Sequence, residues 1–126
     1  MAGRAVTAGS LCCALLALSL GLTHAARAAG GARQGIAVQF VTAANRGDYA
    51  TVCRLYSPHY LKASQASCRW LYGWGAQLYG PFDYRIVRWR TLPNGHWRVD
   101  LIRWHHPSFI ELEHEKAGWR IVAGGW

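Results

Sequence analysis

Residues 82–124 read FDYRIVRWRTLPNGHWRVDLIRWHHPSFIELEHEKAGWRIVAG. Apolar and polar residues alternate along this stretch with a period of two, which is typical of β-strands with one buried face. Asn94-Gly95 is a strong hairpin signal, and two further turns are expected at 105–108 and at Ala117-Gly118. The stretch therefore predicts an antiparallel sheet with strands at 82–92, 96–104, 109–116 and 119–124.

Before residue 80 the period changes to that of helices, which are expected at 35–46, 49–56 and 64–79. Gly47 is suited to end the first helix and Asp48 to cap the second. The inner face of the third helix is expected to carry Cys68, Leu71, Gly75 and Leu78. The order predicts an α+β fold in which three N-terminal helices pack on a four-stranded antiparallel sheet.

The N-terminal segment at 1–28 has the parts of a cleaved signal peptide. Arg4 supplies positive charge, and the apolar run from Leu11 to Leu22 is too short to span a bilayer. Small residues then lead to a cleavage site, for example after Ala28. The expected protein is therefore secreted or associated with the cell envelope, the alternative being an N-terminal membrane anchor.

Cleavage would leave a flexible Gly/Ala-rich leader at 29–34 and one domain at 35–126, with no later segment able to cross a membrane. The two cysteines of that part are Cys53 and Cys68. An even pair in an exported chain predicts a disulfide, and the alternative is a redox or metal pair. Neither Cys-x-x-Cys nor zinc-finger spacing occurs, which favours the disulfide.

The chain carries a formal net charge of +8, and about +6 remains without residues 1–28. Such a charge attracts anionic partners, such as a small anionic molecule or an envelope component. The arginines are spread along the chain rather than clustered, so nucleic-acid binding is not expected.

The segment AVQFVTAANRGDYATVC at 37–53, with its Gly-Asp junction, and the Gly118-Trp119-Arg120-Ile121-Val122 strand carry a family resemblance. Together with Cys68 they resemble small secreted members of the nuclear transport factor 2-like superfamily of actinobacterial type. The resemblance covers about residues 35–126 and implies that the sheet curves into a cone closed by the helices. Because that superfamily includes isomerases, dehydratases, transport adaptors and binding domains, the resemblance implies a fold and not a function.

Turn positions give an expected register, and the register gives the two faces of the sheet. Pairing Leu92 with Trp97, Arg103 with Ile110 and His114 with Ile121 yields one consistent apolar face. That inner face is expected to hold Ile86, Leu92, Trp97, Val99, Leu101, Ile110, Leu112, Ile121 and Ala123. Its expected polar members are Tyr84, Arg88, Arg90, Arg103 and His114, with no carboxylate among them.

These inner polar residues suggest a ligand pocket formed by Tyr84, Arg88, Arg103 and His114. Enzymes of this fold need an inward base, often a carboxylate, and only His114 is expected to point inward. Arginines without an acidic partner either await an anionic ligand or reach solvent at the mouth of the cone. The expected function is therefore a non-enzymatic ligand- or partner-binding domain, with no catalytic residues; the alternative is a small lyase or isomerase that uses His114 with Arg88 or Arg103.

No cofactor is expected, because the sequence has no phosphate-binding glycine loop or catalytic signature. No metal is expected either, because the adjacent His105 and His106 would point apart and lack a carboxylate or cysteine to complete a site.

The outer face is expected to expose four large apolar residues, Val87, Trp89, Ile102 and Trp104. Such a patch favours a homodimer through the outer face, and the alternative is that the C-terminal residues or arginine stems shield it.

Overall fold

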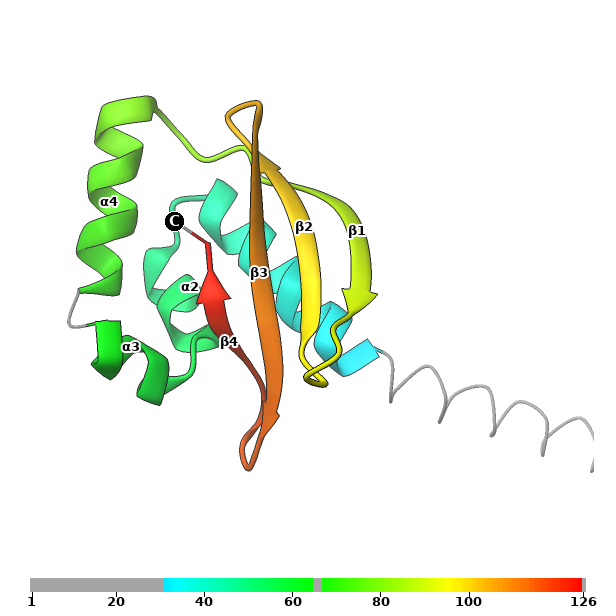
Figure 1. The fold of residues 1–126 in the computed structure, drawn as a ribbon. Coiled ribbons are helices and arrows are strands. Elements are labelled where there is room, and N and C mark those ends of the chain that lie inside the picture. The colour runs from blue at the N-terminus through cyan, green and yellow to red at the C-terminus, as the bar shows by residue number, and fades with distance from the viewer. Residues whose placement is uncertain (1–30, 65–66, 126) are drawn as a thin grey trace, which may run out of the picture. The chain divides into compact units, whose positions relative to one another are not determined.

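The computed structural model describes residues 31–64 and 67–125, and residues 33–126 form one compact unit. A first helix at 31–45 is followed by α2 (Tyr49–Leu55), α3 (Pro58–Ser64) and α4 (Cys68–Tyr79) (Figure 1). The strands are β1 (Arg85–Thr91), β2 (Trp97–Arg103), β3 (His106–Glu115) and β4 (Gly118–Gly124), in sheet order β1-β2-β3-β4. The described fold is thus α+β, with four helices and a four-stranded antiparallel sheet.

The helices differ from the expectation in number and in bounds. Four are described instead of three, because Pro58 ends one helix and begins α3 at a position where its missing N–H costs nothing. The first helix includes residues 31–34, which the sequence suggested to be a leader.

The expected signal peptide at 1–28 lies outside the described residues. Across the described residues, no helix has the length and apolar character needed to cross a membrane.

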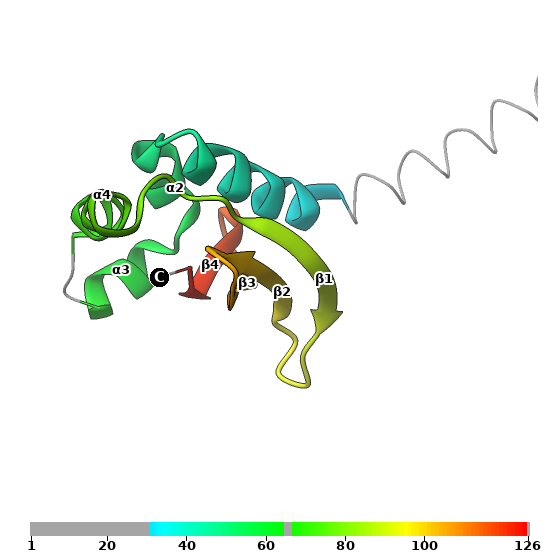
Figure 2. The same cartoon turned by 90° about the horizontal axis from the view of Figure 1, so that it is seen from above.

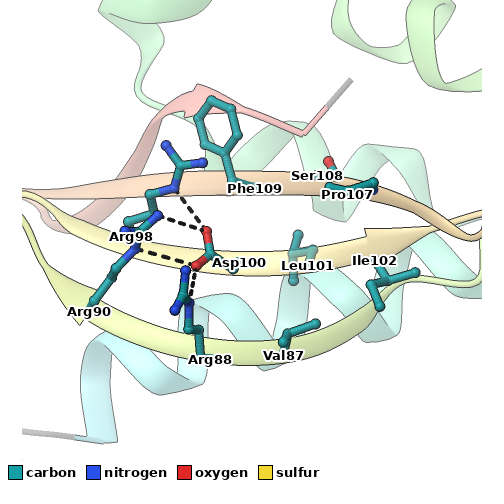
Figure 3. A pocket seen from close by; sticks show the side chains of 10 residues that line it. All are labelled: Val87, Arg88, Arg90, Arg98, Asp100, Leu101, Ile102, Pro107, Ser108 and Phe109. Carbon is teal, nitrogen blue, oxygen red and sulfur yellow. Dashed lines mark hydrogen bonds and ion pairs between the residues drawn. The ribbon is translucent and has the colours of Figure 1, made fainter.

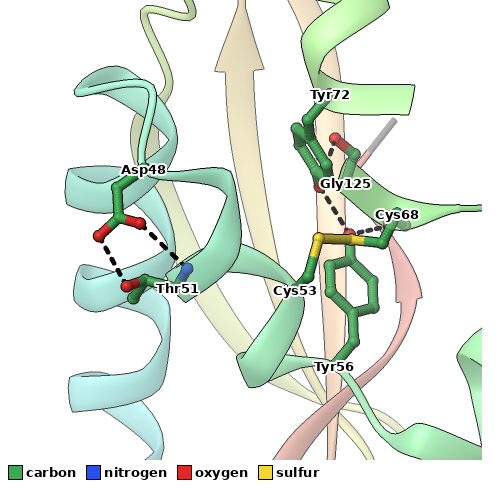
Figure 4. The surroundings of a disulfide bond; sticks show 8 residues. Asp48, Thr51, Cys53, Tyr56, Cys68, Tyr72 and Gly125 are labelled. Atoms are coloured by element: carbon green, nitrogen blue, oxygen red, sulfur yellow. Dashed lines mark hydrogen bonds between the residues drawn. A yellow bond between two sulfur atoms is a disulfide. The ribbon is translucent and has the colours of Figure 1, made fainter. Parts of the chain in front are cut away.

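The junction between the first two helices agrees with the sequence prediction. Gly47 takes a φ of 75°, and the Asp48 side chain accepts a hydrogen bond from the Thr51 amide (3.1 Å) (Figure 4). Hydrogen bonds from the Thr51 side chain and amide hold the pKa of the Asp48 carboxyl below its usual value. Asp48 is therefore used as a helix cap.

One face of the sheet packs on the helices and contains the core. Figure 2 shows the first helix running across this inner face, with α2, α3 and α4 gathered near β4. The side chains of Phe40, Val99 and Ile110 are fully buried between the two layers. Beside β4, the Ser57 amide donates to the Ile121 carbonyl (2.8 Å), which ties the start of α3 to the sheet edge.

The first hairpin is not in the predicted register. Thr91, not Leu92, pairs with Trp97, and a β-bulge at Val87 shifts the register again before Ile86. The one-residue shift turns residues 88–91 over, because strand side chains alternate between faces. Arg88 and Arg90 therefore lie on the outer face, and Trp89 lies on the inner face, where it stacks on Trp97 with ring centroids 4.7 Å apart.

The other two hairpins also differ in register but keep the predicted faces, except at Ala123. Trp104 and His105 form a two-residue turn with φ values of 47° and 66°, where a turn at 105–108 was expected. In the last hairpin Glu115 pairs with Gly118, so the turn is Lys116-Ala117. Next to the turns, both shifts move the pairing by an even number of residues, so inward residues such as Leu112 stay inward. A β-bulge between Glu111 and Leu112 then pairs Ala123 with Glu111 on the outer face, so the prediction that Ala123 points inward is wrong.

Three buried tyrosine hydroxyls surround the end of β4. The Tyr56 hydroxyl donates to the Gly124 carbonyl (2.7 Å) and can accept from the Tyr72 hydroxyl, which lies 2.7 Å away. The Tyr72 hydroxyl lies 3.1 Å from the Gly125 carbonyl (Figure 4). The Tyr84 hydroxyl donates to the same carbonyl. The C-terminal glycines therefore fill space between α4 and the sheet, on the helical side and not over the outer face; Trp126 lies outside the described residues.

These tyrosines predict a specific loss of stability at high pH. Burial raises the pKa of Tyr84 to about 12, although Arg103 opposes the rise, and burial raises the pKa values of Tyr56 and Tyr72 further. In the unfolded chain each would ionise near pH 10, so the stabilisation is complete below about pH 10 and is lost as the pH rises above it. Ultraviolet absorbance should show three tyrosines ionising together with the loss of circular dichroism.

The variant Tyr84→Phe should reduce that cooperative step to two tyrosines. A gradual ionisation of the three hydroxyls in a protein that keeps its native circular dichroism would contradict the prediction.

Candidate functional site

The four residues of the predicted ligand pocket do not lie together. Arg88 is on the outer face of the sheet, with 64% of its side chain exposed. His114 is exposed and makes a ring contact with Trp119 (centroids 5.2 Å apart). The prediction that Arg88 points inward is wrong, because the bulge at Val87 and the longer first turn reverse its strand segment.

His114 and Arg103 lie at opposite ends of the sheet. Arg103 pairs with His106 at the start of β3, and His114 lies near the end of the same strand. Eight strand residues at about 3.3 Å each separate the two positions by roughly 26 Å. Neither arginine of the suggested lyase or isomerase site is therefore placed to work with His114.

Tyr84 and Arg103 are the two members that do meet. A hydrogen bond from Arg103 lowers the pKa of Tyr84 against the larger effect of burial. Arg103 also lines a cavity of about 190 Å³ between α4 and the β2–β3 turn, together with Trp74, Tyr79 and Trp104. Among the described residues, the buried Nε of Arg103 has no hydrogen-bond partner.

A hollow lies on the outer face of the sheet, where Arg88 and Arg90 lie instead of in the interior. It has a volume of about 510 Å³ and follows β1, β2 and the start of β3 (Figure 3). We call it the outer groove, and it is lined by Val87, Arg88, Arg90, Arg98, Asp100, Leu101, Ile102, Pro107, Ser108 and Phe109.

Three guanidinium groups in the outer groove converge on one carboxylate. The Nε atoms of Arg88 (2.6 Å) and Arg90 (3.3 Å) contact Oδ2 of Asp100, and the Nε of Arg98 contacts Oδ1 (2.9 Å). Burial of the Asp100 carboxyl raises its pKa, but hydrogen bonds from Arg88 and Arg98 and the charge of Arg90 outweigh this and give a pKa of about 2. Asp100 is thus ionised at any ordinary pH, and it neutralises only one of three positive charges.

The remaining donors of these arginines can serve a ligand. Each guanidinium has several N–H groups in a planar fork, and Asp100 uses few of them. A second acid, Glu111, pairs with Arg98 Nη1 at 3.9 Å and also lies 3.5 Å from His96 Nδ1, so three arginines and two acids leave a net positive charge. The cluster is therefore a positively charged, pre-organised set of donors that matches a carboxylate or phosphate.

Apolar side chains form the rest of the outer groove. Val87 and Ile102 are 56% and 37% exposed, and Pro107 and Phe109 continue this surface along β3. The Arg98 guanidinium lies over the Phe109 ring, 4.0 Å from its centroid. The outer groove thus places an apolar surface next to a cationic cluster, which suits a ligand that is apolar at one end and anionic at the other.

The expected apolar patch of the outer face is smaller than the sequence suggested. Val87 and Ile102 are there, but Trp89 is on the inner face. Trp104 stacks on Phe82 (centroids 4.6 Å apart) and donates from Nε1 to the Pro81 carbonyl (2.9 Å). The predicted ligand pocket did not include four members of the outer groove: Arg90, Arg98, Asp100 and Phe109. The sequence gives only a weak signal for them, since Arg98-x-Asp100 places opposite charges on one strand face.

Within residues 31–64 and 67–125, no group of three or more histidine, cysteine or acidic side chains is arranged to hold a metal ion. The cysteines instead form the Cys53–Cys68 disulfide, with Cα atoms 5.8 Å apart, as the sequence predicted (Figure 4).

Comparison with known proteins identifies no relative. No protein-family model matches the chain, and neither a curated protein nor a solved structure matches it significantly.

Proposed function

We propose that this chain is an exported, non-enzymatic binding domain that holds the anionic end of an amphipathic ligand or partner in the outer groove. The observation that carries the proposal is the convergence of Arg88, Arg90 and Arg98 on the single carboxylate of Asp100. An excess of positive charge at an open site attracts anions, and a bidentate guanidinium binds carboxylate and phosphate well.

Export is part of the same proposal and is supported by two features. The disulfide is of a kind that persists in oxidising compartments, and the segment at 1–28 has the pattern of a signal peptide. A cone of the nuclear transport factor 2-like type is the fold we propose, supported by the helices packed on the inner face of a curved sheet (Figure 2).

The binding role is favoured over catalysis by what occupies the helical side of the sheet. Tyr56, Tyr72 and Tyr84 are buried around Gly125 there, and their hydroxyls are bonded to each other or to backbone carbonyls. His114 has the Trp119 ring as its neighbour, and the described residues give it no carboxylate partner. A general base needs to be within hydrogen-bonding reach of a substrate in a pocket, and His114 is exposed near the far end of β3.

Three ligands with one alkyl chain and different head groups test the outer groove: octyl phosphate, octanoate and octanol. We expect the two anions to bind in isothermal titration calorimetry and octanol to bind about tenfold more weakly or not at all. Replacing both exposed arginines, Arg88→Gln with Arg90→Gln, should weaken anion binding by about tenfold or more, because hydrogen bonds to charged groups are lost.

Arg46→Gln is the matched control, since Arg46 is an exposed arginine at the end of the first helix, outside the outer groove. Its binding should equal that of the unchanged protein. Equal affinity for octanol and octyl phosphate, or unchanged anion binding in the double variant, would refute the assignment of the outer groove.

A further inference from the structure

Helix α4 carries several exposed apolar side chains. Trp70, Trp74, Leu78 and Tyr79 are 62%, 47%, 53% and 66% exposed. We call these four residues the α4 stripe. The sequence predicted Leu78 to point inward, which is wrong, because the buried side of α4 is formed by Cys68 and Tyr72.

Helical spacing explains this arrangement. Trp70, Trp74 and Leu78 follow each other at intervals of four, so they share one side of the helix. At 3.6 residues per turn, Trp70 and Trp74 lie nearly opposite to Cys68 and Tyr72, and Leu78 lies about a quarter of a turn from them. The indole rings of Trp70 and Trp74 stack on each other, with centroids 5.8 Å and planes 11° apart. The two largest side chains of α4 are thus held together in solvent instead of in the core.

The stripe reaches the sheet through Tyr79, the last residue of α4. Tyr79 lies against Trp104 of the β2–β3 turn, with ring centroids 5.0 Å apart. Trp74 and Tyr79 also form part of the wall of the 190 Å³ cavity that Arg103 lines. The exposed surface is therefore broad, extending across α4 to the sheet, and large contiguous apolar surfaces of this kind mark contact sites.

The charges around the α4 stripe are mainly positive. Residues 49–79, which include α2, α3 and α4, contain no Asp or Glu, whereas Arg54, Lys62 and Arg69 are all exposed. The acid just before α2, Asp48, interacts electrostatically with Arg54 and Arg69 and offsets one of these positive charges. Arg103 lies at the other end of the surface, where it lines the cavity. The acid near that end, Asp83, is engaged by a hydrogen bond from the backbone amide of the β2–β3 turn (2.7 Å). A partner that covers the stripe thus meets an excess of positive charge.

We infer that the α4 stripe is a peripheral docking surface for an anionic lipid bilayer. Trp and Tyr favour the boundary between head groups and acyl chains, where an aromatic body and a polar N–H or O–H are both satisfied. A helix with large apolar residues on its exposed side and cations at its flanks lies in the plane of that boundary. Surrounding arginines and lysines add attraction to anionic head groups.

A sugar polymer is the main alternative partner for exposed tryptophans, and the stripe suits it less well. Sugar hydroxyls need several hydrogen-bonding side chains next to the ring faces, and residues 69–79 supply only Arg69, Gln77 and Tyr79. The Trp70 and Trp74 rings also cover part of each other's faces by stacking. An apolar surface with flanking cations is better matched by lipid.

The experiment uses residues 29–126, which contain the whole compact unit but not the apolar N-terminal run that would itself bind lipid. Co-sedimentation with vesicles of phosphatidylcholine alone is compared with vesicles of equal parts phosphatidylglycerol and phosphatidylcholine. We expect binding to the anionic vesicles, a blue shift of tryptophan fluorescence, and weaker binding at high salt.

The variant Trp70→Ser with Trp74→Ser should lose about tenfold or more of its partitioning, and Arg69→Gln about fivefold at low salt. Both should keep the circular dichroism of the unchanged domain, because these side chains point away from the core. Val38→Ser is the matched control, since Val38 is 51% exposed on the first helix and outside the stripe, and it should bind as the unchanged domain does.

Three outcomes would overturn the inference. One is vesicle binding that survives the double tryptophan variant but is lost in Arg88→Gln with Arg90→Gln, which would assign lipid contact to the outer groove. Another is tryptophan-dependent binding to insoluble polysaccharide in place of vesicles. The last is self-association in analytical ultracentrifugation that depends on Trp70 and Trp74, with no vesicle binding, which would make a second copy the partner. Failure of the outer groove to bind anions leaves this inference unaffected, because the two surfaces have separate variants.

Discussion

Replacing Gly125 with alanine is expected to destabilise the domain by about 3–5 kcal/mol, a large part of the total stability of a small domain. Gly125 has a φ of 96°, which an L side chain rarely adopts. A Cβ there would also lie 2.6 Å from the Tyr72 hydroxyl and overlap that of Tyr56. Both hydroxyls are buried and bonded, so moving them also costs hydrogen bonds.

Urea or thermal unfolding measures the effect, and we expect the melting temperature to fall by about 15 °C or more. Gly73→Ala is the matched control, because Gly73 lies in α4, has an ordinary helical φ and would place a Cβ with no atom within 4 Å. That substitution should stabilise the domain by about 0.5–1 kcal/mol through helix propensity.

The double variant Gly125→Ala with Tyr56→Phe keeps the prediction testable if the single variant does not fold. It removes the hydroxyl that the new Cβ overlaps, so part of the lost stability should return. If the free energy of unfolding of Gly125→Ala is within about 1 kcal/mol of that of the unchanged domain, the C-terminal glycines are not packed against the tyrosines as described.

The sequence allowed the strand order and most of the core to be predicted, because alternation is strong in β2 and β3. Val99, Leu101, Ile110 and Leu112 are fully or almost fully buried, as that pattern indicated. Register errors by an even number of residues did not change which side chains point inward. That is why two wrong turns had little effect on the predicted core.

The candidate site could not be predicted, because it depends on features that leave no periodic signal. One bulged residue, Val87, and one extra residue in the first loop decide that Arg88 and Arg90 join Asp100 outside. The turn at Trp104 and His105 uses left-handed backbone without glycine, which residue preferences do not suggest. The closing of the interior by Gly125 depends on tyrosines far apart in the sequence.

Removing the Cys53–Cys68 disulfide is expected to lower stability by roughly 3 kcal/mol. The bond joins α2 to the first turn of α4 across a sequence separation of 15, so it limits the freedom of this loop in the unfolded chain. α4 packs on α2, and it carries Tyr72, which binds Gly125. Loss of the bond should therefore affect the tyrosine cluster as well as the loop.

The variant Cys53→Ala with Cys68→Ala measures this, and we expect a fall in melting temperature of roughly 12–24 °C for a domain of this size. The unchanged domain in the presence of a thiol reductant should unfold at nearly the same temperature as the variant. Because Cys68 is only 7% exposed, this comparison separates the loss of the crosslink from the loss of side-chain packing at Cys68. A variant that is as stable as the oxidised domain would show that the helices hold α4 without the crosslink. Two free thiols in mass spectrometry of the exported protein would remove the disulfide and, with it, the structural support for an oxidising compartment.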